Sequence, residues 1–550
     1  MLDLPVLSVK HLSVAFGSHP AVRDLSFDIH AGETLALVGE SGSGKSASAL
    51  SVMRLIEREG GQITEGQIRL GRETPVDLAA LPDAQMQPLR GNRISMIFQE
   101  PMTSLNPVMR IGAQLSEVLR RHQGLGRAEA LEAAEQALDQ VRIPEPARRL
   151  RQYPHELSGG LRQRVMIAIA LACRPEVLIA DEPTTALDVT TQAGVLRLLK
   201  SLQAELGMAV LFITHDMGVV AEIADRVTVL RHGRTEEQAH VRDLFAAPKS
   251  AYAQELMAAT PKLGQSEIRP PVPRAAPVLS VRGLCKEFHL GGGWITPRRV
   301  TQAVRDVSFE IAPGETLGLV GESGCGKSTL SRTIMRLIEP DAGEVRLDGR
   351  DFTGLQDDEL RRERSNLQMV FQDPFASLNP RMTVQDLITE PAYLHDGIGA
   401  RDRQALARDL LEKVALPADA AARYPHQFSG GQRQRLCIAR ALSVSPKVII
   451  ADEAVSALDV STAARVTKLM RQIQDDLGIA FLFISHDIAV VERVSHRIAV
   501  MFEGEIVEIG PTDQVLRSPQ HPYTCKLLAA VPVPVPAAPR PVGQMAEPAH

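Results

Sequence analysis

The sequence predicts two α/β domains in tandem along its 550 residues. The first reason is that an ordered series of motifs occurs twice in the same order. The second is that each series opens with a short apolar run, a glycine-rich loop and a helical stretch, as expected where a buried strand leads into a helix. The length agrees, since a single compact core seldom exceeds about 250 to 300 residues.

The repeat has a long period and ordered landmarks. Residues 39–46 (GESGSGKS) return as residues 321–328 (GESGCGKS), and residues 158–160 (SGG) return as residues 429–431. Such spacing indicates two copies of one domain and not a solenoid of small units. The copies differ by insertions, and the segment GGGWITPRR of the second copy is predicted to lengthen a hairpin loop.

Proline-rich segments set the domain boundaries. Residues 260–277 lack apolar periodicity and are predicted to form a semi-rigid linker between a first domain at residues 1–259 and a second at residues 278–530. Residues 531–550 are also rich in proline and are expected to form a disordered tail.

Composition excludes several classes of function. The formal net charge of -5 offers no polybasic surface for nucleic acid phosphates. The five cysteines lie far apart without a CxxC pair, so neither a disulfide framework nor a zinc site is expected. No apolar run approaches the roughly 18 to 20 residues that span a bilayer, and the start lacks the pattern of a secretory signal. We therefore expect a cytoplasmic protein that does not bind nucleic acid.

The glycine-rich loops predict two phosphate-binding sites. Glycines let the backbone aim its N–H groups at phosphates. A helix is predicted to follow each loop, extending through residue 55 in the first copy, and the positive end of its dipole would also face the phosphates. Lys45 or Lys327 would neutralise β- and γ-phosphate charge. A chance glycine-rich turn is the alternative, which two matches in register exclude. The residues expected to bind ATP in the loops are Gly39, Glu40, Ser41, Gly42, Ser43, Gly44, Lys45 and Ser46, and Gly321, Glu322, Ser323, Gly324, Cys325, Gly326, Lys327 and Ser328.

Two acidic pairs predict the metal-binding and hydrolytic groups. Asp181 and Glu182 follow one apolar strand, and Asp452 and Glu453 follow its counterpart. We assign the aspartates, with the hydroxyls of the loop serines, to Mg²⁺, and the glutamates to orienting and deprotonating the attacking water. Alone, such acids could simply favour a helix dipole, but beside phosphate loops the catalytic interpretation is preferred.

The order of these motifs resembles that of ATP-binding-cassette (ABC) ATPases. The resemblance covers nearly the whole chain outside the linker and the tail. It implies two P-loop NTPase domains, each with an inserted helical subdomain, near residues 101–157 and 374–428. The matching residues beyond the loops and acidic pairs are Gln99, Leu157, Ser158, Gly159, Gly160, Ala186, Leu187, Asp188 and His215, and in the second copy Gln372, Phe428, Ser429, Gly430, Gly431, Ser456, Ala457, Leu458, Asp459 and His486.

The resemblance implies a role for each of these groups. Phe16 and Phe288 would stack on adenine. The glutamines would sense Mg²⁺ and the attacking water, and the histidines would contact the γ-phosphate. The metal ligands implied are Ser46, Gln99 and Asp181 at one site and Ser328, Gln372 and Asp452 at the other. The catalytic residues implied are Glu182, His215 and Gln99, and Glu453, His486 and Gln372.

In this family the Ser-Gly-Gly segment serves the facing domain. Ser429 would therefore complete the site of Lys45, and Ser158 the site of Lys327, so that one chain forms both sites head to tail. ATP would close the two halves and hydrolysis would reopen them, which requires the closed state to bind ATP more tightly than the open state.

Three further segments resemble the dipeptide, oligopeptide and nickel importer branch. They are QEPMTSLNP after Phe98, QDPFASLNP after Phe371, and His521-Pro-Tyr-Thr524, of which the first copy keeps only the tyrosine in residues 250–253. The branch looks like the fused peptide or glutathione importer ATPases. It implies two transmembrane permease subunits, a periplasmic or extracellular solute-binding protein, and peripheral association with the cytoplasmic face of the inner membrane.

Alternatives to a peptide importer remain at this point. A nickel importer ATPase has the same motifs, because the solute contacts other subunits. A soluble tandem cassette acting on ribosomes or DNA is less favoured, since the linker is short and zinc-binding cysteines are missing. A non-catalytic binding module conflicts with the intact lysines and glutamates.

Differences between the copies predict two hydrolytic sites of unequal rate. Leu161 stands where the second copy has a glutamine, Ala454 where the first has a proline, and Ala47 where the second has a threonine. Cys325 lies within the second phosphate loop. It is either a tolerated spacer or a thiolate made reactive by the helix N-terminus, in which case alkylation should inhibit and ATP should protect.

Overall fold

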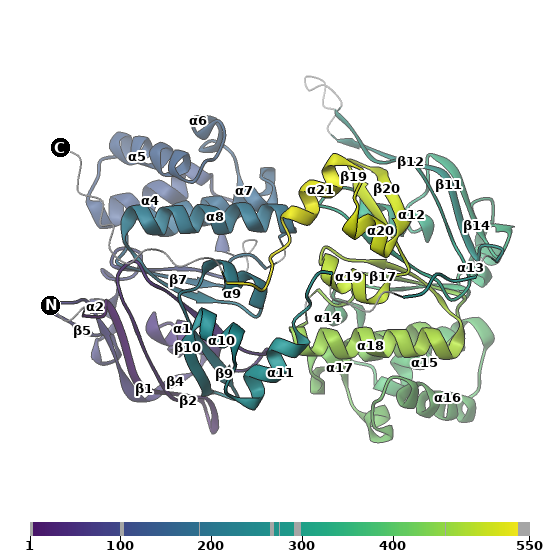
Figure 1. The fold of residues 1–550 in the computed structure, drawn as a ribbon, viewed down its shortest axis with the longest axis horizontal. Helices are drawn as coiled ribbons and strands as arrows, with labels where there is room; N and C mark the ends of the chain where they lie inside the picture. Colours follow the sequence, from purple (N-terminus) through teal and green to yellow (C-terminus); the bar gives the residue numbers. More distant parts are fainter. Residues whose placement is uncertain are drawn as a thin grey trace. The chain divides into compact units, whose positions relative to one another are not determined.

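The protein is described from a computed structural model that covers residues 4–99, 104–185, 187–264, 269–273, 275–290, 299–456 and 458–536. The chain folds into two compact units, formed chiefly by residues 1–260 and 261–531 (Figure 1). Each unit contains a mixed six-stranded sheet, an antiparallel four-stranded sheet and a group of helices. The α/β class predicted from the sequence is confirmed.

The central sheet of the first unit has the strand order β10-β9-β3-β8-β7-β6. Its strands β3, β7 and β8 are buried along their whole length, as their continuous apolar sequences require in a sheet covered on both faces. β3 pairs in parallel with β8 and β9, and β7 with β8 and β6, so these strands end at the same edge of the sheet. The strands of the first unit are β1 Leu7–Phe16, β2 His19–Ile29, β3 Thr34–Val38, β4 Gln62–Leu70, β5 Val76–Asp77, β6 Ile94–Ile97, β7 Val177–Asp181, β8 Ala209–Ile213, β9 Arg226–Arg231 and β10 Arg234–His240.

Helices of the first unit lie on both sides of this sheet. The predicted helical subdomain is present: α4, α5 and α7 lie together on one side of the unit, and β1, β2 and β4 of the antiparallel sheet lie on the other (Figure 1). The helices are α1 Lys45–Val52, α2 Asp83–Met86, α4 Ile111–Gln123, α5 Arg127–Gln140, α6 Pro146–Arg149, α7 Gly159–Leu171, α8 Val189–Leu206, α9 Met217–Ile223, α10 Val241–Ala246 and α11 Ala251–Ala259, with 3-10 turns η1 Ile56–Glu59, η2 Leu78–Ala80 and η3 Pro154–Glu156.

The second unit repeats this arrangement, with sheets in the orders β16-β17-β18-β13-β19-β20 and β12-β11-β14-β15. Its strands are β11 Leu279–Leu290, β12 Arg299–Ile311, β13 Thr316–Val320, β14 Ala342–Leu347, β15 Arg350–Asp351, β16 Leu367–Val370, β17 Val448–Asp452, β18 Ala480–Ile484, β19 Arg497–Phe502 and β20 Glu505–Pro511. Its helices are α12 Lys327–Ile334, α13 Asp357–Glu363, α14 Pro374–Ser377, α15 Val384–Asp396, α16 Ala400–Lys413, α17 Gly430–Leu442, α18 Val460–Leu477, α19 Ile488–Val494, α20 Thr512–Arg517 and α21 Pro522–Ala529, with 3-10 turns η4 Ala418–Ala422 and η5 Pro425–Gln427.

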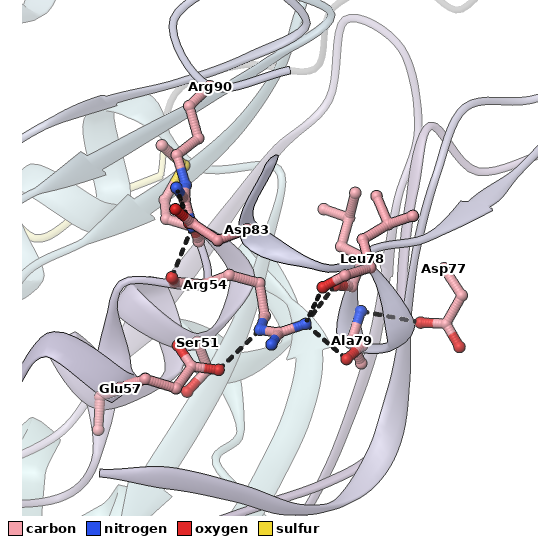
Figure 2. Close-up of polar contacts among 11 residues, drawn as sticks. Ser51, Arg54, Glu57, Asp77, Leu78, Ala79, Asp83 and Arg90 are labelled. Carbon is pink, nitrogen blue, oxygen red and sulfur yellow. Dashed lines mark hydrogen bonds and ion pairs between the residues drawn. The ribbon is translucent and has the colours of Figure 1, made fainter. Parts of the chain in front are cut away.

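A half-buried arginine, Arg54, ties the helix after the first phosphate loop to the 3-10 turn η2, which follows β5 of the antiparallel sheet (Figure 2). The predicted helix through residue 55 ends earlier, at Val52, because Arg54 takes a left-handed conformation (φ 51°). Its guanidinium donates to the carbonyls of Leu78 and Ala79 at 2.8 and 2.5 Å and to Glu57 at 2.7 Å. Arg336, with φ 52°, takes the same role in the second unit. The network fixes the far end of the helix whose first residues carry the site.

Several predicted segments fall partly outside the described residues. The strands β11 and β12 that flank GGGWITPRR pair up to Leu290 and Arg299, while the predicted longer hairpin loop at residues 291–298 lies outside the described part. Ala186, Ala457, residues 100–103, residues 537–550 of the tail and residues 265–268 of the linker also lie outside it. In the described linker, Arg269 donates to Asp475 of α18 at 2.6 Å.

Candidate active sites

The two phosphate loops lie at the carboxyl ends of β3 and β13, and their glycines are required by the backbone. Gly44 and Gly326 have φ of 101° and 111°, in the region that favours glycine. A Cβ on Gly39 would lie 2.2 Å from the carbonyl oxygen of Leu230, and one on Gly321 would lie 2.3 Å from that of Met501. Both loops are thus packed against the end of the neighbouring strand, β9 or β19.

The loop lysines are buried and point back along their own loops. The Lys45 ammonium donates to the carbonyls of Gly39 and Glu40 at 2.7 and 2.9 Å. Lys327 does the same with Gly321 and Glu322, at 2.9 and 2.8 Å. The two lysines are only 5–6% exposed, so water has little access to their ammonium groups. Hydrogen bonds to the carbonyls offset the cost of burying this charge. Each lysine is therefore held against the backbone of its own loop.

The loop serine and the strand-end aspartate meet in each unit. Ser46 Oγ donates to Asp181 at 3.2 Å, and Ser328 Oγ lies 3.5 Å from Asp452. Burial raises the pKa of Asp181 to about 6, opposed by the Ser46 hydrogen bond and increased by neighbouring Glu182. The charge of Lys45 lowers the pKa by less than burial raises it, so a further cation would stabilise the ionised carboxylate.

Glu182, the glutamate at the end of β7, is the centre of a hydrogen-bonded group in the first unit. Its carboxylate accepts from the Gln99 amide at 3.0 Å and the Thr185 hydroxyl at 2.9 Å, and lies 3.1 Å from His215 Nδ1. Glu182 has a left-handed backbone (φ 47°), a strained conformation that turns its side chain toward these partners. The structure thus brings together Gln99, Glu182 and His215, as predicted from the sequence.

Electrostatics keep this glutamate ionised. Burial raises its pKa, but the hydrogen bond and charge of His215, the Thr185 hydroxyl and the charge of Lys45 outweigh that effect and lower the pKa of Glu182 to about 2. Conversely, Glu182 raises the pKa of His215 against the effect of burial. Each side chain of the pair thus stabilises the charged form of the other.

The second unit has the same group with two differences. Gln372 donates to Glu453 at 2.7 Å and His486 Nδ1 lies 3.5 Å from it, but the Ser456 hydroxyl donates to the backbone carbonyl of Glu453 instead of its carboxylate. Asp452 gains a second donor, because Ser331 Oγ donates to it at 3.2 Å, where the first unit has an alanine. Motif matching missed Thr185 and Ser331. Only comparison of the two copies position by position could have shown them.

The signature serines begin helices of the inserted subdomains. Ser158 and Ser429 cap α7 and α17, each accepting from the N–H three residues on at 3.4 Å. The Gln432 side chain also accepts from the Ser429 N–H at 3.0 Å, a bond that Leu161 cannot form in the first unit. The assignment of both serines to the facing domain stays a prediction.

The proposed adenine-stacking residues are accessible. Phe16, the last residue of β1, and Phe288, near the end of β11, are 37% and 36% exposed. Lys286 lies over the Phe288 ring, with Nζ 5.9 Å from its centroid.

The structure argues against a reactive thiolate in the second phosphate loop. Cys325 is 8% exposed, and burial raises the pKa of its thiol, although the nearby Lys327 opposes the rise. The expectation of a low-pKa cysteine at the helix N-terminus is therefore wrong, because desolvation outweighs the local positive charge. The tolerated-spacer interpretation is retained.

Comparison with known proteins identifies the family. A model of the ABC transporter family matches residues 22–185 and 304–456, together more than half of the chain. The chain belongs to the ABC transporter family. A model of the oligopeptide/dipeptide transporter C-terminal region also matches residues 507–549. ABC ATPase domains bind ATP, and this ABC protein is an ATPase.

Curated relatives extend the match over nearly the whole chain. Glutathione import ATP-binding protein GsiA of Shigella boydii serotype 4 (strain Sb227) is 52% identical over 568 residues, covering 98% of this chain and 91% of that protein. GsiA of Escherichia coli (strain K12) has the same identity and coverage. Within the described ranges, no helix has the length and apolarity needed to cross a bilayer.

A solved structure also matches part of the chain. It is a dimeric post-hydrolysis state of the ATP-binding cassette MJ0796 bound to ADP and Pi, with 30% identity and a TM-score of 0.39. The match covers 42% of this chain and 98% of that one.

Proposed function

We propose that this chain is the fused ATP-binding subunit of an importer of glutathione and related small peptides. It would act at the cytoplasmic face of the inner membrane with two permeases and a solute-binding protein. The observation that carries the proposal is that each unit holds its own Gln–Glu–His group beside a lysine-bearing phosphate loop. The similarity to glutathione import ATP-binding proteins supports the solute class.

We propose that Glu182 and Glu453 direct water onto the γ-phosphate. The water oxygen forms a bond to phosphorus while the bond to the oxygen bridging to ADP breaks, and the water proton passes toward the glutamate carboxylate. In the first unit the His215 ring is hydrogen-bonded to one carboxylate oxygen of Glu182. A γ-phosphate that drew His215 away would remove a group that lowers the glutamate pKa, making Glu182 a stronger base as ATP binds.

The donors beside each loop fit Mg²⁺. Ser46 and Asp181 supply a hydroxyl and a carboxylate already in contact, with the Gln99 amide on the adjacent glutamate. Mg²⁺ commonly takes one or two protein carboxylates and fills its other positions with water and nucleotide phosphates. When bound, it would neutralise charge on the β- and γ-phosphates. The equivalent donors in the second unit are Ser328, Asp452 and Gln372.

Reconstituted transport tests the proposed solute. The chain would be purified with its own permeases and placed in liposomes with the solute-binding protein, and ATP-dependent uptake of labelled glutathione, a dipeptide and Ni²⁺ would be compared. We expect glutathione uptake, with ATPase activity stimulated by the loaded binding protein. The matched control is the Glu182→Gln, Glu453→Gln double variant, which should bind ATP without driving uptake.

Two outcomes would contradict the proposal. Uptake of Ni²⁺ without glutathione or peptide would favour the nickel alternative. ATPase activity that ignores both the permeases and the loaded binding protein would exclude an importer.

A further inference from the structure

A tyrosine hydroxyl bonds to the backbone of each phosphate loop. The N–H of Glu40 donates to the Tyr252 hydroxyl at 3.2 Å, and the N–H of Glu322 donates to the Tyr523 hydroxyl at 3.0 Å. Each tyrosine lies at least 200 residues beyond its loop, on the last described helix of its own unit, α11 or α21. Both are nearly inaccessible, at 2% and 6% exposure. The same long-range contact is therefore built twice.

The residue held by the tyrosine is also the residue that holds the lysine. Glu40 donates its N–H to Tyr252 and accepts the Lys45 ammonium on its carbonyl at 2.9 Å. In the second unit Glu322 makes the corresponding bonds, and its carbonyl is 2.8 Å from Lys327 Nζ. One backbone residue thus joins the tyrosine hydroxyl to the loop lysine.

A buried or half-buried glutamate fixes the start of each tyrosine-bearing helix. Glu237 of β10 accepts from the N–H of Ser250 at 2.8 Å, and Glu508 of β20 accepts from the N–H of His521 at 3.1 Å. Burial raises the pKa of both glutamates, but the Ser250 N–H at Glu237, and the Thr524 side chain with the Gln520 and His521 N–H groups at Glu508, help to lower it below its usual value. The helix is therefore anchored at its first turn, from which the tyrosine points back to the loop.

The cap residues differ between the copies while the tyrosine is kept. Ser250 Oγ accepts from the N–H of Ala253 at 3.0 Å, whereas His521 Nδ1 accepts from the N–H of Tyr523 at 3.2 Å. Ring packing differs as well: the Arg231 guanidinium lies 4.6 Å from the Tyr252 ring centroid, and Phe502 lies 4.2 Å from that of Tyr523. The feature common to both units is the hydroxyl at the loop N–H.

We propose that Tyr252 and Tyr523 are positioning residues that preorganise the two phosphate loops for ATP. Each holds the loop in the conformation in which its N–H groups and lysine face the phosphates, so that less ordering is needed when nucleotide binds. The inference rests on the proposed role of these loops in binding ATP. It gives the tyrosine of the C-terminal segment a physical role in both cassettes.

Phenylalanine substitutions test the hydroxyl while keeping the ring. Tyr252→Phe and Tyr523→Phe would be made separately and together in the full chain, with Tyr393→Phe, on the exposed surface of α15, as the matched control. MgATP binding would be measured in the Glu182→Gln, Glu453→Gln background, so that hydrolysis does not interfere. Loss of one ordinary hydrogen bond corresponds to an affinity change of about fivefold. We expect each single variant to bind MgATP about fivefold more weakly at one site, and the double variant to do so at both sites.

Further measurements separate positioning from general destabilisation. In chains with both glutamates intact, KM for ATP should rise about fivefold while kcat at saturating ATP stays within about twofold. Backbone exchange in the loop segment should quicken without nucleotide and slow again at saturating ATP. If one variant fails to fold, the other tests the same contact in a separate unit.

The outcomes distinguish this inference from the function on which it rests. ATP affinity and loop exchange equal to wild type in a folded Tyr→Phe variant would overturn the positioning role alone. A fall in kcat with unchanged KM would also overturn it. A wild-type chain that binds no ATP would overturn the proposed role of the loops, and the inference with it.

Discussion

At the residue scale, the two glutamates differ in how their carboxylates are held. Thr185 and Ser456 occupy equivalent positions, yet only the threonine hydroxyl reaches the carboxylate, at 2.9 Å, while the serine hydroxyl turns to a backbone carbonyl. A β-branched side chain has fewer accessible rotamers, which favours one fixed hydroxyl direction. The first site is therefore the more tightly organised around its glutamate.

Thr185→Val tests this difference. The variant keeps the shape of the side chain and removes the hydrogen bond that orients the Glu182 carboxylate. The same bond lowers the glutamate pKa, but we expect the loss of orientation to dominate, so that ATP turnover at the first site falls by roughly threefold to tenfold. Ser456→Ala should lower turnover at the second site by less than about twofold, because its hydroxyl does not touch the carboxylate. Each would be measured by steady-state ATPase assay with the glutamate of the other site replaced by glutamine. Equal effects would contradict the assignment.

At the element scale, the strand that leads into each phosphate loop is held at its first residue by different acceptors. The N–H of Thr34 donates to Asp225 in the first unit, and the N–H of Thr316 donates to His496 Nδ1 in the second, both at 2.9 Å. Burial, aided by the charge of Arg269, lowers the pKa of His496 to about 4. The second loop-bearing strand thus depends on a neutral histidine.

Stability of the second unit should therefore depend on pH. His496 stays neutral in the fold, whereas in the unfolded chain it takes up a proton below about pH 6.5. The stabilisation that neutral His496 gives the fold is complete above pH 6.5 and is lost as the pH falls from 6.5 toward 4. We expect a loss on the order of 1 to 2 kcal/mol at pH 5, seen as a lower thermal unfolding midpoint.

His496→Asn provides the comparison. Its amide oxygen can accept the Thr316 N–H and does not titrate, so the part of the pH dependence due to the histidine should disappear. The control is His426→Asn, an exposed position in the same unit that should leave the pH dependence unchanged. An identical decline between pH 6.5 and 5 in wild type and His496→Asn would contradict the role of the buried imidazole.

At the scale of the whole molecule, two copies of one domain carry different site details. The Glu182 carboxylate has three partners within 3.1 Å, whereas His486 lies 3.5 Å from Glu453. Ser331 donates to Asp452, whereas the equivalent position of the first unit is an alanine, and Gln432 completes a capping box at α17 that Leu161 cannot complete at α7. These differences support the expectation of unequal hydrolysis, which stays a prediction.

Single glutamate substitutions measure that inequality. Loss of a general base lowers turnover at its own site by roughly 10²- to 10⁴-fold, so the residual ATPase activity of each variant reports mainly the other site. We expect Glu182→Gln to leave less activity than Glu453→Gln, because the first glutamate is the better oriented. Residual rates would be compared at saturating MgATP with equal protein concentrations. Equal residual activity would show that the differences have no kinetic effect.

The sequence by itself determined the two α/β domains, the phosphate loops and the acidic pairs. These follow from local rules: continuous apolar runs form buried parallel strands, glycines occupy the loop conformations that side chains disfavour, and motif order identifies the family. Such rules do not predict where a helix ends. The left-handed Arg54 that follows α1 donates to carbonyls about 25 residues further along the chain.

Only the tertiary structure decided which distant groups meet. The Tyr252 hydroxyl reaches its loop across 212 residues, and no periodicity or motif spacing encodes that contact. The same holds for Ser331 at Asp452, for His496 at Thr316, and for the burial that raises the pKa of Cys325 and overturns its expected reactivity. Hydrogen bonding and desolvation depend on three-dimensional neighbours, whereas sequence patterns report mainly on the adjacent turn or strand.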